Sequence, residues 1–157
     1  MANTSRRGLL AGIAATSAAG ISVQVAAAPM VEPSDAAFLH WLDLAGAGNS
    51  SPSGLSDDEW ELVEVAERAF IALPATPAKA LTLALHELSY LFSEMRDRTV
   101  EGLLSGCDQD ARFALRIVLC LRSGASGRVA QIVADLFDEP TRPTSEILLC
   151  RYYAGVA

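Results

Sequence analysis

The stretch TPAKALTLALHELSYLFSEM, Thr76 to Met95, decides the fold of this chain. Its apolar residues recur at steps of three and four, which is the spacing of one face of an α-helix and not the alternation of a strand. Thr76-Pro77 marks the start, because threonine is a favoured N-cap and proline is favoured at the first helical position. We expect this helix to continue to about Leu104, where Ser105-Gly106 ends it. The apolar positions are Leu81, Leu85, Leu88, Leu91, Phe92 and Met95.

Two helices are expected before this stretch. Ser56 and Glu59 have the spacing of a capping box, in which each side chain binds the other residue's backbone amide, and they begin a helix that ends near Leu73. An earlier helix is expected from Ser34 to Leu44. Small and turn-forming residues follow it at 46–54 and predict a loop. Because that loop separates it from the rest of the bundle, the first helix is expected to pack loosely or to act as a flap.

Three more helices are expected towards the C-terminus. Asp108 caps one that ends near Leu121, another covers about 127–137, and Thr144 or Ser145 caps a last short one reaching Tyr153. Short turns between amphipathic helices predict an all-α fold, a compact bundle of five to six antiparallel helices. The predicted organisation has three parts: a signal segment at 1–27, the first helix with a flexible loop at 28–55, and the helical bundle domain at 56–157.

The composition limits the classes of function. Of 157 residues 51% are apolar and 20% are charged, which allows a buried core and argues against intrinsic disorder. The formal net charge of −7 and a single lysine, Lys79, exclude a broad nucleic-acid surface, because phosphate binding needs clustered cations.

The first residues have the layout of an export signal. Ser5, Arg6 and Arg7 precede Leu9 and Leu10, and no charged side chain follows until after Met30. A basic start, an uncharged middle and a small-residue end are typical of a cleaved signal peptide. We expect cleavage between two alanines, since a cut one residue later would place Pro29 beside the broken bond. Those alanines are Ala27 and Ala28.

The Ser5-to-Leu10 segment resembles the twin-arginine motif, Ser-Arg-Arg-x-Phe-Leu-Lys, with Leu9 in place of Phe and Ala11 in place of Lys. The resemblance implies a bacterial cell, passage of the folded chain through the twin-arginine translocase, and a periplasmic or secreted product. No stable membrane span is expected after cleavage. Two alternatives remain open: an uncleaved signal that anchors the chain in a membrane, and a false signal on a cytoplasmic protein.

Two groups of residues are candidates for chemistry. Cys120 and Cys150 lie in apolar runs of different helices and could form a disulfide in an oxidising compartment; the other reading is that they are small buried hydrophobes. His86 and Glu87 are the candidate polar site, although His86 shares its helix side with serine and threonine and is therefore expected to face water. The sequence points to no metal, no cofactor and no catalytic residue, since it lacks the common zinc, nucleophile, phosphate-loop and haem motifs.

Arginine side chains offer one further candidate. Arg96 and Arg98, with Arg112 and Arg116, could form an anion site. The interpretation we favour is pairing with acidic neighbours on helix surfaces, Glu94 with Arg98 among them.

The segment Ala66 to Leu81, AERAFIALPATPAKAL, resembles small uncharacterised proteins of alphaproteobacteria that carry a twin-arginine signal. The resemblance brings no catalytic residue with it. The leading hypothesis is an exported helical protein of the cell envelope that acts by binding, as a homo-oligomer or as an accessory of another envelope protein. Its rivals are an enzyme or cofactor carrier with a non-standard site, and a cytoplasmic prophage-type or regulatory module.

Overall fold

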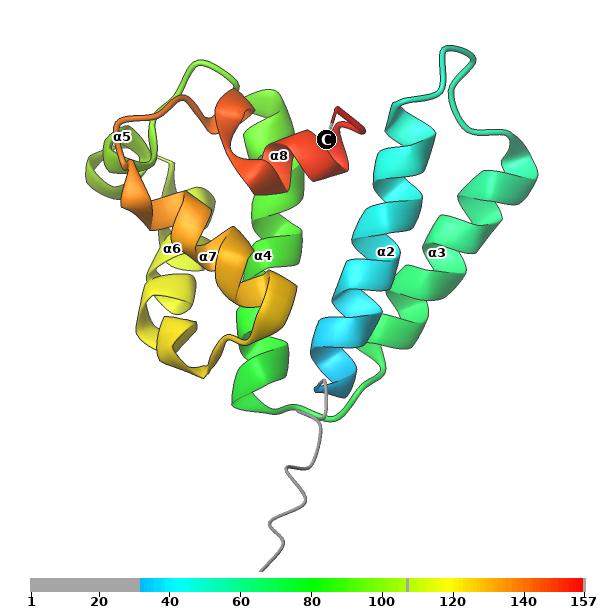
Figure 1. Ribbon diagram of the computed structural model, residues 1–157, viewed down its shortest axis with the longest axis horizontal. Helices are drawn as coiled ribbons and strands as arrows, with labels where there is room; N and C mark the ends of the chain where they lie inside the picture. The colour runs from blue at the N-terminus through cyan, green and yellow to red at the C-terminus, as the bar shows by residue number, and fades with distance from the viewer. Residues whose placement is uncertain (1–31, 107, 157) are drawn as a thin grey trace, which may run out of the picture. The chain divides into compact units, whose positions relative to one another are not determined.

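The computed structural model describes residues 32–106 and 108–156, and within them it is all-α, as the sequence predicts (Figure 1). The predicted signal motif and the cleavage point lie outside the described residues. Two single turns of 3₁₀ helix, Arg122–Gly124 and Thr144–Glu146, accompany seven α-helices in the described part. These are α2 (Pro33–Asn49), α3 (Asp57–Ile71), α4 (Pro77–Glu94), α5 (Val100–Ser105), α6 (Gln109–Leu121), α7 (Gly127–Asp138) and α8 (Leu148–Tyr153).

Helix α4 lies at the centre of the described unit. Helices α2 and α3 form an antiparallel pair on one side of it, and α5, α6 and α7 lie on the other side (Figure 1). The C-terminal α8 packs on both α2 and α4 and so joins the two sides. The described helices belong to one compact unit with one continuous apolar core.

The first helix is part of that core, which corrects the expectation that it packs loosely or acts as a flap. Phe38, Trp41 and Leu42 of α2 are completely buried, and the Phe38 ring lies 6.1 Å from that of Phe70 in α3. A helix that contributes two such aromatic side chains to the core cannot move away without exposing a large apolar area.

Helix α2 is also longer than predicted. It begins at Pro33, has no side-chain cap, and continues through the glycine-containing stretch to Asn49. The glycines are needed for close packing rather than for a loop: a Cβ atom at Gly46 would collide with the Tyr152 carbonyl, and one at Gly48 would collide with the Leu55 side chain. The glycines of this stretch therefore predicted a loop, whereas they belong to a helix that other segments approach closely.

The single long helix predicted from Pro77 to Leu104 is divided in two. Helix α4 ends at Glu94, and α5 starts after Thr99, whose hydroxyl accepts the Gly102 amide at 3.0 Å. The carbonyls freed at the break are bound from a distant segment, since Thr144 donates its hydroxyl to the Met95 carbonyl at 2.6 Å and its amide to the Arg98 carbonyl at 2.8 Å. Tertiary hydrogen bonds thus replace the helical ones.

The same segment corrects the prediction for the last helix. Thr144 is buried and begins only a 3₁₀ turn, and α8 starts later, at Leu148, without a side-chain cap of its own. The Leu148 amide instead donates to the Asp135 carboxylate of α7. A carboxylate at a helix start accepts a hydrogen bond from a free amide and interacts favourably with the positive end of the helix dipole. It therefore replaces the expected cap.

Two local predictions are confirmed. Ser56 and Glu59 form the capping box, with the Ser56 amide donating to the Glu59 carboxylate at 2.8 Å. Thr76 caps α4, and its side chain accepts the Lys79 amide at 3.1 Å. The ammonium group of this lysine is buried and donates to the carbonyls of Ile71 and Leu73, which lie where α3 ends. The lysine thereby fixes the turn between α3 and α4.

Candidate functional site

The polar side of α4 is buried, which corrects the expectation that it faces water. Thr82 and Ser89 have no exposed surface, and His86 is 8% exposed. The two hydroxyls can be buried because each donates to a carbonyl of its own helix, that of Thr82 to Ala78 at 3.1 Å and that of Ser89 to His86 at 2.6 Å. The side of α4 that carries His86 therefore packs inside the protein.

His86 lies among aromatic side chains from four helices. Its ring centroid is 4.2 Å from that of Trp41 in α2, 5.7 Å from Phe70 in α3 and 5.2 Å from Tyr90 in α4. Tyr153 of α8 completes the cluster, with its ring 5.2 Å from that of Tyr90. The cluster joins α2, α3 and α8 to this side of α4.

One carboxylate reaches the imidazole, and it is not the one that the sequence suggested. His86 Nε2 lies 3.1 Å from Oε1 of Glu67 in α3. Glu87 points to the other side of α4, where it lines a surface hollow against α6. The structure thus does not bring His86 and Glu87 into one site. Glu67 was missed because it stands in an acidic run, although it follows the buried Val63 by one helical turn, a spacing that places it beside the buried stripe.

The surroundings change the ionisation of this cluster. Burial lowers the pKa of His86. The charges of Glu67 and Glu87 act in the opposite direction but do not cancel this shift. Burial is also the largest cause that raises the pKa of Tyr90 to about 12, followed by the Glu67 charge. Both shifts follow from the cost of placing a charge in an apolar environment. At neutral pH His86 is therefore an uncharged member of the core.

The cysteines do not form the disulfide that the sequence suggested. Cys120 and Cys150 are both free thiols, the first exposed on α6 and the second buried in α8. Burial raises the pKa of Cys150 to about 12, so its thiol is un-ionised and unreactive at neutral pH. Cys150 is a small buried hydrophobe, and Cys120 lies on the outer surface.

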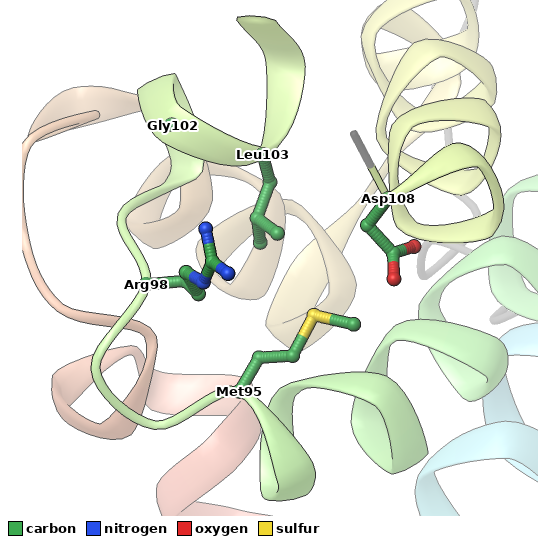
Figure 2. A pocket seen from close by; sticks show the side chains of 5 residues that line it. All are labelled: Met95, Arg98, Gly102, Leu103 and Asp108. Atoms are coloured by element: carbon green, nitrogen blue, oxygen red, sulfur yellow. The ribbon is translucent and has the colours of Figure 1, made fainter. Parts of the chain in front are cut away.

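One surface hollow lies where α4, α5 and α6 meet. It has a volume of about 290 Å³, and Figure 2 shows the side chains of Met95, Leu103 and Asp108 directed towards the same space, with Arg98 at its edge. The Asp108 carboxylate is already used, since it accepts the Ala111 amide at 2.8 Å as the cap of α6.

Neither the expected ion pair nor the candidate anion site of the arginines is present among the described residues. The expected Glu94–Arg98 pair is absent from the ion pairs of the described residues, because α4 ends at Glu94 and the two side chains do not share a helix. Arg98 and Arg116 line different hollows, so they do not make one anion site.

A second feature of the surface is apolar. One hollow of about 410 Å³ lies between α4 and α6, and an adjoining one of about 570 Å³ lies along α6. Phe113 and Ile117 line both hollows and are 55% and 43% exposed. We call the joined surface the apolar strip. It consists of Leu83 from α4 and of Phe113, Ile117, Cys120 and Leu121 from α6.

The described residues contain no group of three or more His, Cys, Asp or Glu side chains placed to hold a metal ion. Within that part of the chain, none of the helices has the length and apolar character that crossing a bilayer needs. No family model matches the chain, and no curated protein or solved structure matches it either.

The buried histidine makes stability depend on pH. The unfolded chain takes up a proton near the ordinary pKa of 6.5, whereas the folded His86 has a lower pKa. Its contribution is therefore fully present above 6.5 and is lost as the pH falls through the lower folded value. We expect urea titrations between about pH 8 and pH 5 to show a loss of unfolding free energy that is smaller in His86→Gln.

The exposed His40 supplies the matched control for this experiment. His40→Gln should keep the pH dependence of the unchanged protein. An identical pH dependence in His86→Gln and the unchanged protein would contradict the burial of this imidazole.

Proposed function

We propose that this protein is exported by the twin-arginine pathway and acts in the cell envelope by binding another protein chain, not by catalysing a reaction. The apolar strip carries the proposal. Large apolar side chains that gather on one surface are typical of protein-protein contacts, whereas single exposed ones are not. The strip is continuous over two hollows and lies on α6 and on the central helix α4.

The positions of the titratable groups favour a binding protein over an enzyme. His86 and Glu67 are the closest imidazole-carboxylate pair among the described residues, but the imidazole is inside the core and packs against Trp41. A general base has to reach its substrate, and none of the three hollows described above is lined by His86. We therefore propose no catalytic role for this pair.

The export part of the proposal rests on the twin arginines. In a bacterium with a working twin-arginine pathway, the full chain should appear in the periplasm with an intact mass that starts at Ala28. Changing Arg6 and Arg7 together to lysine should keep the uncleaved chain in the cytosol, since the translocase reads the arginine pair. Changing the exposed Arg68 and Arg122 to lysine is the control and should leave export intact.

An uncleaved cytosolic product from the unchanged chain would contradict export and favour the cytoplasmic module. An uncleaved product in the membrane fraction would favour an anchor.

The binding part is tested inside the cell with a photo-crosslinking amino acid. Placed at Phe113 in the exported chain, it should give one discrete crosslinked protein product, because this position lies in the middle of the apolar strip. The same group at Ser123, which is exposed beyond the strip, is the matched control and should give none. No product at Phe113, or equal products at both positions, would contradict binding through the strip.

A further inference from the structure

The charges beside the apolar strip are divided by sign. On α6, Asp110 lies about 60° to one side of Phe113 and Arg116 about 60° to the other, since successive residues turn by about 100°. Glu87 of α4 lines the same hollow as Asp110. Arg112 lies on the side of Arg116, about 100° from Phe113. Phe113 therefore lies between an acidic edge, formed by Glu87 and Asp110, and a basic edge, formed by Arg112 and Arg116.

These four charges have no partner within the described part of the chain. Its ion pairs and side-chain hydrogen bonds involve other residues. Asp110, Glu87 and Arg116 are exposed, and Arg112 is partly exposed. All four are available to a molecule that covers the strip.

We propose that a second copy of this chain covers the apolar strip, in a two-fold dimer whose α6 helices lie side by side and run in the same direction. The inference rests on the proposed function, binding through the strip, and names the partner. A surface that pairs with its own copy must be self-complementary, and an apolar centre with one acidic and one basic edge meets this requirement.

The division of charge also sets the direction of the helices. When two facing helices are related by a two-fold axis parallel to them, opposite edges meet, so Asp110 and Glu87 face Arg112 and Arg116 of the second copy. When the axis crosses the helices, like edges meet and arginine faces arginine. Attraction between opposite charges therefore favours the parallel arrangement.

The parallel arrangement places specific residues near the axis. Phe113 and Cys120 are one heptad apart and so lie within about 20° of each other on the helix. In a parallel pair, residues on this central line meet the same residues of the second copy. The exposed Cys120 thiol is therefore expected to lie close to Cys120 of the second copy.

The other exposed apolar surface does not have this symmetry. Helix α3 exposes Leu62 and Val65 on one face. Its charged residues are all acidic except Arg68, so two copies of this face would repel each other. The α3 surface therefore serves as a control.

The test measures the molar mass and the dissociation constant of the purified mature chain by light scattering and sedimentation. We expect a dimer, and a mainly monomeric protein when Ile117 is changed to Asp. Phe113→Gln is a milder second variant, and circular dichroism checks that both remain helical. Leu62→Asp on α3 is the matched control and should remain a dimer.

Charge reversal tests the orientation. Arg116→Glu should raise the dissociation constant by about tenfold, and adding Asp110→Arg to the same chain should recover part of the affinity. An antiparallel pair would instead be strengthened by Arg116→Glu, because a repulsion would be removed. With the other two cysteines changed to alanine, a short bis-maleimide should join Cys120 to its copy.

The outcomes separate this inference from the proposed function. A monomer at all concentrations, together with a crosslink from position 113 to a different protein in the cell, would overturn the dimer and leave binding through the strip intact. A monomer without any crosslink from position 113 would overturn both. A dimer that Ile117→Asp and Phe113→Gln leave unchanged would overturn the use of the strip as its interface.

Discussion

The contact between Trp41 and His86 is the one on which the arrangement of this protein depends. The two rings lie 4.2 Å apart and join α2 to the central helix α4, with Phe70 of α3 beside them. Truncating a buried tryptophan costs about 3–5 kcal/mol. An exposed ion pair such as Glu64–Arg68 contributes about 0.3–0.5 kcal/mol. Aromatic packing therefore decides how α2, α3 and α8 sit around α4.

The two sides of α4 differ in their surroundings. On the His86 side, polar residues are buried with their hydroxyls satisfied inside the helix, so this side is a closed core. On the Leu83 side, α4 and α6 leave an apolar strip with charges at both edges. We propose a structural role for the first side and binding for the second. The free, exposed Cys120 lies in the apolar strip, and the buried Cys150 lies on α8, which also packs against α4.

The sequence predicts the fold class and several helix starts, because caps and apolar periodicity act locally. The capping box at Ser56 and the cap at Thr76 were found in this way. What it missed depends on contacts between distant segments: the glycines that let α2 approach Tyr152, the binding of the α4 end by Thr144, and the pairing of His86 with Glu67. The candidate site was half predicted, since His86 was chosen with the wrong carboxylate and the wrong burial.

The central claim, that Trp41 is buried against His86, can be tested by fluorescence. The chain has two tryptophans, and Trp60 is 50% exposed. In Trp60→Phe only Trp41 emits, and acrylamide should quench it severalfold less than it quenches the remaining Trp60 in a Trp41→Phe chain. The emission of Trp41 should also lie at shorter wavelength, as expected for an indole in an apolar environment. Equal quenching of the two tryptophans in folded protein would contradict this account of the core.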